Sequence, residues 1–331
     1  MVNHEHVLAV DIGGTYIRLG VIDAQGELHG SLLKKRVPFR GDGVADPDGL
    51  IDLLEAREKQ CEEAMGRRLP LGISLCGNVD PKTGEAVLVA NLHWQNVPFG
   101  PQIHERLGVP VYIATDVREA ALAEAVWGAG QDVDNFFWLT VGTGYGGYLF
   151  LNGRLYGGAH GFAGNVGHTP LDEKEGYLCG CGQRGCVETF VAGPAIARAG
   201  QIAVEKQMSP ILAAMAGGGE VTCRMVFEAA EAGDEAAQRI MHRVIRLIAM
   251  NMASTVNLLD LEMIILGGGV ANAAPWFRER INERVRDFLM TVEARRDLQI
   301  VPESFPNSAL WGAAAHVFSV EGVLDPSLLE G

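Results

Sequence analysis

The sequence lacks a long hydrophobic run, an excess of basic residues and a leader that would direct it across a membrane. No apolar stretch approaches the roughly 20 residues that span a bilayer, and residues 1–6 show no basic segment followed by an apolar core. The net charge is −14, which argues against nucleic acid or an anionic membrane as the main partner. We therefore expect a cytoplasmic protein that binds neither nucleic acid nor membranes.

Cysteine is scarce, but three of the six cysteines stand close together. His168, Cys179, Cys181 and Cys186 fall within nineteen residues, and intervening glycines allow the chain to fold back between them. Buried free cysteines beside a core histidine are the plainer interpretation of this group. Three thiolates and one imidazole are also the ligand set of a tetrahedral zinc ion, and the count and short spacing favour a zinc knuckle. A zinc ion with four protein ligands would be structural.

Glycine, by contrast, is abundant in turns that follow apolar strands. A predicted strand over 7–10 leads into Asp11 and the turn Gly13, Gly14, Thr15, and a returning strand is predicted over 17–23. The glycines let backbone N–H groups approach an anion, and Asp11 is suited to hold a hydrated magnesium ion. A plain hairpin turn would contain the same residue types.

One later turn repeats this arrangement, and a further glycine run follows another predicted strand. A predicted strand over 135–141 runs into residues 142–147, where Thr143 and Gly144 correspond to the first turn about 130 residues earlier. The pair indicates two related halves, each with a phosphate loop. Gly268 lies in a run of three glycines after a predicted strand over 262–266, which suits either a nucleotide or a tight structural turn.

Two polar stretches are open to two interpretations. Thr115 and Asp116 close a predicted strand over 109–114 and open a helix over 117–127, so Asp116 is either a helix cap or a carboxylate facing a ligand at a strand end. Residues 91–95, Asn-Leu-His-Trp-Gln, suit the lining of a sugar pocket or a surface loop with one packing tryptophan.

These motifs resemble the ROK family of sugar kinases, which belongs to the larger fold of actin and hexokinase. The resemblance extends over nearly the whole chain and rests on the three glycine turns, on Asp116, and on the Cys-x-Cys-Gly-x-x-Gly-Cys knuckle with the Gly-His ahead of it and Glu188 after it. The family also contains sugar-responsive repressors. Here the first strand begins at Val7, which leaves no room for a helix-turn-helix before it.

The resemblance implies an α/β fold: a two-domain actin-like ATPase (ribonuclease H-like) fold with a structural zinc knuckle. The expected N-terminal lobe covers 1–117 with the first phosphate loop and part of the sugar site. The expected C-terminal lobe covers 118–307 with the second phosphate loop, the knuckle and the nucleotide site, and 308–331 can pack back on the first lobe. A homodimer is also expected from the family.

The implied activity is transfer of the γ-phosphate of ATP to a hexose, usually at its 6-hydroxyl, with Asp116 as the general base. The implied cofactors are ATP, Mg²⁺ and a structural Zn²⁺. The residues expected to bind the sugar are Gly77, Asn91, Thr115, Asp116, Asn165, His168 and Glu188. Those expected to bind the nucleotide and magnesium are Asp11, Gly13, Gly14, Thr15, Thr143, Gly144 and Gly268, and the expected zinc ligands are His168, Cys179, Cys181 and Cys186.

Two departures from the family pattern concern the sugar. Family members commonly carry Glu at the position of Asn165 and Asn at that of Thr115. Because an amide donates where a carboxylate only accepts, the favoured pattern of sugar hydroxyls should change. We expect reduced activity on glucose, with allose, fructose or another hexose as alternatives. The short stretches 34–36, 159–161 and 311–314 also resemble those of bacterial allose kinases. A sugar-binding regulatory protein without efficient turnover is the alternative function.

Overall fold

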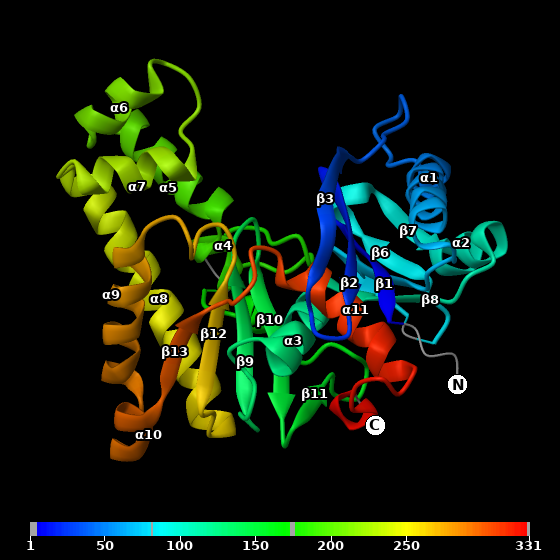
Figure 1. Cartoon of the computed structure of the whole chain (residues 1–331). Coiled ribbons are helices and arrows are strands. Elements are labelled where there is room, and N and C mark those ends of the chain that lie inside the picture. Colours follow the sequence, from blue (N-terminus) through cyan, green and yellow to red (C-terminus); the bar gives the residue numbers. More distant parts are fainter. Residues whose placement is uncertain (1–4, 81, 173–175, 330–331) are drawn as a thin grey trace. The chain divides into compact units, whose positions relative to one another are not determined.

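The computed structural model of the chain describes residues 5–80, 82–172 and 176–329, and it divides into two compact units (Figure 1). The first unit comprises Met1–Asp134, Phe150–Tyr156 and Glu303–Gly331, and the second comprises Asn135–Leu149 and Gly157–Pro302. The first unit thus continues past residue 117, where the sequence analysis placed a boundary. Residues 1–4, on which the absence of a leader was partly judged, lie outside the described residues.

The first unit is built on a five-stranded sheet with the order β3-β2-β1-β4-β8. Its strands are β1 (His6–Ile12), β2 (Tyr16–Asp23), β3 (Leu28–Arg36), β4 (Leu71–Leu75) and β8 (Val111–Thr115). β2 runs antiparallel to β1, whereas β4 and β8 run parallel to it. Parallel strands need crossover connections, and helices supply them.

β1 is buried on both faces of the sheet, because its alternate residues enter different cores. Leu8, Val10 and Ile12 pack with residues of α1 (Pro47–Met65) and α2 (Phe99–Leu107), whereas Val7 and Ala9 pack against α11 (Ser308–Val320). The continuous apolar run that such a strand requires is what the sequence shows. α11 also packs on α3 (Asp116–Trp127), where a Cβ on Gly312 would lie 1.6 Å from the Glu119 carbonyl oxygen. This contact places α3 in the first unit.

The smaller elements of this unit form a second sheet and two short helices. The sheet has the order β5-β6-β7, with β5 (Asn78–Val79), β6 (Ala86–Val89) and β7 (Trp94–Val97). The 3₁₀ helices are η1 (Ala90–Leu92) and η4 (Pro326–Leu328). Trp94 is buried, and its ring centroid lies 4.9 Å from that of Phe99 with the two rings tilted by 53°. Its indole nitrogen donates to the Ala45 carbonyl, so Trp94 is a core residue.

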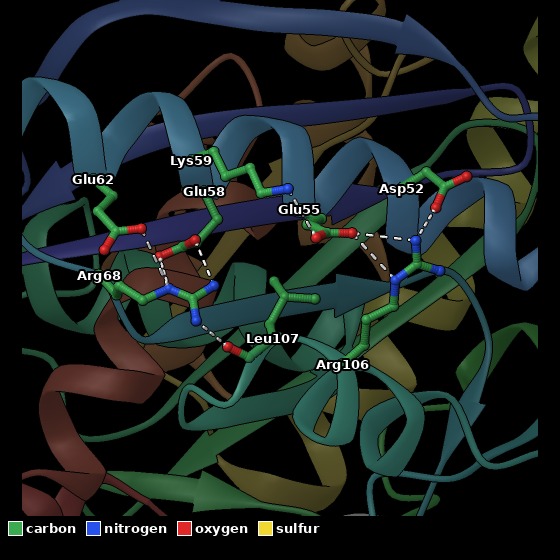
Figure 2. A network of polar contacts seen from close by, with 8 residues as sticks. All are labelled: Asp52, Glu55, Glu58, Lys59, Glu62, Arg68, Arg106 and Leu107. Atoms are coloured by element: carbon green, nitrogen blue, oxygen red, sulfur yellow. Dashed lines mark hydrogen bonds and ion pairs between the residues drawn. The ribbon is translucent and has the colours of Figure 1, made fainter.

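A network of charged side chains joins α1 to the chain around α2 (Figure 2). Arg68 makes a forked pair with the fully buried Glu58 at 2.9 and 2.7 Å, and it also donates to the Leu107 carbonyl. Arg106 pairs with Asp52 and Glu55 on the exposed side of α1. The network therefore contains one ion pair with a fully buried member, Glu58, and removal of its partner Arg68 would leave that carboxylate uncompensated in the core.

The second unit repeats the same strand order in its own sheet, β11-β10-β9-β12-β13. These strands are β9 (Phe136–Val141), β10 (Tyr145–Leu151), β11 (Arg154–Tyr156), β12 (Met263–Gly267) and β13 (Gln299–Pro302); the tip formed by residues 150–156 is grouped with the first unit. β12 runs parallel to both β9 and β13. The repeated order agrees with the two related halves expected from the sequence.

Helices make up most of the rest of the second unit. They are α4 (Glu188–Val191), α5 (Gly193–Glu205), α6 (Pro210–Ala216), α7 (Cys223–Glu231), α8 (Glu235–Leu259), α9 (Pro275–Val285) and α10 (Val292–Asp297), with the 3₁₀ turns η2 (Val166–His168) and η3 (Arg286–Phe288). α8 begins after Asp234, whose carboxylate caps the Ala237 amide. Within the described residues, no helix is long and apolar enough to cross a membrane.

Candidate functional site

Three strands of the first unit end level with one another and bring three chemically different residues together. Ile12 pairs with Leu75, and Leu75 pairs with Thr115, so β1, β4 and β8 finish at the same edge of the sheet. The residues that follow are Gly13, Cys76 and Asp116. The carboxyl ends of parallel strands are where α/β sheets meet their ligands. We call Asp11, Cys76, Asn91 and Asp116 the carboxylate cluster.

Asp11 is buried at this edge, with 6% of its surface exposed, and three side chains donate to its carboxylate. Arg18 donates at 2.8 Å, Ser74 at 3.2 Å and Asn307 at 3.1 Å. Arg18 and Ser74 are the direct cross-strand partners of Asp11 on β2 and β4. None of these three donors was predicted from the sequence. The strand pattern contains a signal for Arg18 and Ser74, because residues opposite each other on neighbouring strands share a face of the sheet.

Asp116 opens α3, and its environment favours the protonated form of its carboxyl group. Burial, and to a smaller extent the negative charge of Asp11, raise the pKa of Asp116 to about 6, although the hydrogen bond from the Val117 amide opposes the shift. Thr115, at the N-cap, makes no capping hydrogen bond with its side chain. An ionised Asp116 would thus accept a proton readily near neutral pH.

Cys76 and Asn91 complete the carboxylate cluster. Burial and the charges of Asp116 and Asp11 raise the pKa of the Cys76 thiol to about 12, so it remains protonated at neutral pH. Asn91 packs on the first turn, where a Cβ on Gly14 would lie 2.7 Å from its own. Gly77 is equally confined, because a Cβ there would lie 2.8 Å from the Leu88 carbonyl oxygen. The cluster is therefore held by close backbone approaches that glycine alone permits.

In the second unit, two glycine turns line one cavity. Gly267 pairs with Thr140, so β9 and β12 end level and the turns at 142–144 and 267–269 lie side by side. The cavity, about 410 Å³, is lined by Gly142, Thr143, Gly193, Pro194, Ala197, Cys223, Gly269 and Val270. At Gly268 φ is +96°, and a Cβ there would lie 2.4 Å from the Thr140 hydroxyl. Such a hollow, with backbone amides at glycine turns, is suited to a phosphate-bearing ligand.

The four expected zinc ligands lie together, as the sequence predicted; we call His168, Cys179, Cys181 and Cys186 the metal cluster. Their ligand atoms lie within 4.8 Å of one another, with Cys181 Sγ 3.6 Å from Cys186 Sγ and Cys179 Sγ 3.5 Å from His168 Nδ1. Ligands about 2.3 Å from a tetrahedral zinc ion would be about 3.8 Å apart. The donor set and the spacing therefore fit a four-coordinate metal ion, with His168 Nδ1 facing the group.

The other residues expected at the sugar lie close to this metal cluster. Glu188 opens α4, where one carboxylate oxygen accepts from the Tyr145 amide at 2.9 Å and the other lies 3.6 Å from Cys179 Sγ. Asn165 precedes η2, is exposed, and donates to the Phe162 carbonyl at 3.0 Å. Glu188 thus connects the metal cluster to the strand that follows the second glycine turn.

Comparisons with known proteins identify the family. The ROK family profile matches residues 7–319, so the chain belongs to the ROK family. It is similar to the N-acetylmannosamine kinase of Vibrio vulnificus, with 34% identity over 271 residues that cover 81% of this chain and 84% of the relative. This relationship confirms the resemblance inferred from the glycine turns and the knuckle.

Two solved structures show the same fold. A ROK family glucokinase from Streptomyces griseus in complex with glucose and AMPPNP is 30% identical, with a TM-score of 0.77, and the match covers 93% of this chain and 98% of that one. A ROK family transcriptional regulator, homologous to the E. coli MLC protein, is 27% identical, with a TM-score of 0.80 over 94% of this chain and 77% of its own. The family thus includes both kinases and regulators on this α/β fold.

Proposed function

We propose that this protein is an ATP-dependent hexose kinase in which Asp116 is the general base. The observation that carries the proposal is a carboxyl group with a pKa of about 6 at the edge where three strands end. The ionised carboxylate would accept the proton of a sugar hydroxyl, most simply the 6-hydroxyl, as its oxygen attacks the γ-phosphorus. General-base catalysis of this kind typically contributes about a hundredfold to ten-thousandfold in rate.

The residues of the two glycine turns would hold the phosphates. Asp11 would place a magnesium ion, while Gly13, Gly14 and Thr15 would donate toward the phosphate oxygens. Thr143 and Gly144 would do the same in the second unit, and Gly268 would lie near the adenosine. Phosphoryl transfer depends mainly on positioning and charge neutralisation, which these groups can supply.

The hexose would be recognised by the polar groups that the family resemblance assigns to the sugar. These are Asn91, Thr115 and Asp116 with the backbone at Gly77, and Asn165, His168 and Glu188. His168 faces the metal cluster with Nδ1, which leaves Nε2 for a sugar hydroxyl and lets the metal fix the tautomer. Because Asn165 offers an amide where the family commonly carries a carboxylate, we propose a hexose other than glucose as the preferred substrate.

The metal cluster would hold one structural zinc ion, through three thiolates and one imidazole. Such thiolates persist in a reducing compartment, which supports a location in the cytoplasm. We also propose a homodimer, on family grounds alone.

The decisive experiment is a panel of hexoses with ADP release followed by a coupled assay. Glucose, allose, fructose, mannose and N-acetylmannosamine are each tested with ATP and Mg²⁺. We expect one sugar to stimulate ADP release far above the sugar-free rate, and glucose to be a poor substrate. If sugars raise the melting temperature but none stimulates ADP release, the alternative applies: a sugar-binding regulatory protein without efficient turnover.

A further inference from the structure

Tyr145 is the first residue after the second glycine turn, and side chains from two other elements hold it at both ends. Its amide donates to Glu188 Oε2 at 2.9 Å, and its hydroxyl donates to Asn251 Oδ1 at 3.0 Å. The side chain is 3% exposed, and burial raises the pKa of its phenol, which keeps the hydroxyl a donor. The residue that closes the turn is therefore fixed in both backbone and side chain.

Asn251, on α8, continues this connection to the loop that carries a metal ligand. Its amide nitrogen donates to the Thr169 hydroxyl at 3.1 Å and to the Val166 carbonyl at 3.4 Å, on either side of His168. Asparagine can accept from Tyr145 with its oxygen while it donates to this loop with its nitrogen. Asn251 thus joins the second glycine turn to the segment around His168.

The same two segments are also in backbone contact, and a second link reaches the thiolate side of the metal cluster. A Cβ on Gly167 would lie 1.7 Å from the Tyr145 carbonyl oxygen, which leaves no room between the two chains. Glu188, which holds the Tyr145 amide, lies 3.6 Å from Cys179 Sγ. A shift of either segment that carries a metal ligand would therefore displace Tyr145, since tightly packed interiors transmit small displacements.

We infer that Tyr145 and Asn251 are positioning residues that couple the metal cluster to the second glycine turn, so that metal occupancy sets the affinity of this turn for nucleotide phosphate. The inference rests on the proposed nucleotide binding at the turn. Neither side chain belongs to a glycine turn or to the knuckle. Because coupling between two binding sites is reciprocal, bound nucleotide should also raise the affinity for the metal. We expect this gain mainly as a slower release of the metal, since affinity differences are mostly differences in dissociation rate.

The test is calorimetric titration of the full chain with ADP and Mg²⁺, before and after removal of the metal by a chelator. In the unaltered protein, metal removal should weaken ADP binding about threefold to tenfold, as expected for loosening one or two hydrogen bonds. In Asn251→Ala and in the isosteric Tyr145→Phe, ADP should bind about threefold more weakly at the outset. Metal removal should then have a smaller further effect in either variant than in the unaltered protein.

Asn257→Ala is the matched control. Asn257 also lies on α8 and also uses both ends of its amide, donating to the Phe288 carbonyl and accepting from the Met290 amide. This substitution removes two side-chain hydrogen bonds from the same helix, compared with three at Asn251, and none of the two involves the metal loop. It should leave the response of ADP binding to metal removal as it is in the unaltered protein.

A second measurement uses only metal-loaded protein, so it does not depend on the stability of the stripped form. The rate of zinc transfer to a coloured chelator is followed with and without ADP. ADP should slow the transfer in the unaltered protein and in Asn257→Ala, but much less in Asn251→Ala and Tyr145→Phe. Equal slowing in all four proteins would overturn the coupling and leave the proposed function intact. If the unaltered protein binds no ADP at all, the proposed function fails, and the inference fails with it.

Discussion

The two sheets of this protein have the same strand order, yet they equip their glycine turns differently. The turn after β1 follows a carboxylate on its own strand, Asp11, which cross-strand partners hold in place. On β9 the corresponding position, two residues before the turn, is the neutral Thr140, and the nearby carboxylate, Glu188, comes from the helix that follows the metal cluster. The repeated topology places backbone amides at a glycine turn in both units. The carboxylate beside them comes from the strand itself in the first unit and from a helix in the second.

This comparison predicts that the first turn depends on local charge and the second on the integrity of the metal cluster. The largest expected effect is that of Asp116→Asn, which should lower kcat about a hundredfold to ten-thousandfold with little change in sugar affinity. Steady-state kinetics and sugar-induced thermal shifts measure the two quantities. Glu188→Gln, which keeps an acceptor for the Tyr145 amide, should lower kcat much less. Full turnover in Asp116→Asn would remove this residue from the base role.

The next largest effect concerns the scaffold of the first unit. Arg68→Ala should lower the free energy of unfolding by about 3–5 kcal/mol, because it leaves the fully buried Glu58 without its partner. Glu58→Ala should cost less, since Arg68 is 39% exposed and can be hydrated. Urea denaturation measures both. Lys59→Ala breaks an exposed pair with Glu55 and serves as the control, at about 0.5 kcal/mol or less; an equal loss in all three variants would contradict the buried-pair account.

Removal of the metal should act on the second unit in particular. Metal analysis should find about one zinc ion per chain, and zinc at a hundred times its Kd would stabilise the folded state by about 2.7 kcal/mol. Chelation should accordingly lower the melting temperature and increase hydrogen exchange around residues 165–188 more than along β1 and β4. Burial raises the pKa of Cys179 to about 12, so metal binding must release a proton there and stripping should be easier at lower pH. Uniform exchange along the whole chain would contradict a local role.

The smallest expected effect is a displaced pH profile. Since Asp116 must be ionised to accept a proton, kcat/KM should fall as pH drops below about 6. Asp11→Asn removes a negative charge that raises the pKa of Asp116, so this acid limb should move to lower pH, by less than about one unit. A profile measured at saturating Mg²⁺ separates the displacement from weakened metal binding. An acid limb that moves to higher pH would contradict the assigned interaction.

The features that the sequence predicted are those encoded over short distances. The strands at 7–10 and 262–266 and the helix at 117–127 are present because apolar runs and a polar start are local signals. The grouping of the four residues of the metal cluster could also be predicted from the sequence, since they lie within one short segment. The sequence left two interpretations of residues 91–95 open, a sugar-pocket lining and a surface loop with one packing tryptophan. The structure shows the role of Trp94, which lies in the core.

The partners that complete each site were not predictable, because no local pattern brings them together. Asn307 reaches Asp11 across 296 residues of sequence, and Asn251 meets Tyr145 from the middle of an amphipathic helix whose apolar spacing predicts only packing. The extent of the first unit was missed for the same reason. The packing of α3 on α11 depends on Gly312, whose neighbour Glu119 is almost two hundred residues earlier.

The position of α11 has a consequence for how the chain is made. This helix covers Val7 and Ala9 of the first strand, and a Cβ on Gly72 would lie 1.9 Å from its Ala313 carbonyl oxygen. The residue before it, Asn307, completes the donors around Asp11. During synthesis on the ribosome, the earliest sheet therefore keeps one apolar face uncovered until nearly all of the chain has emerged. A premature stop anywhere ahead of this helix should yield a product prone to aggregation and proteolysis, even when the second unit is intact.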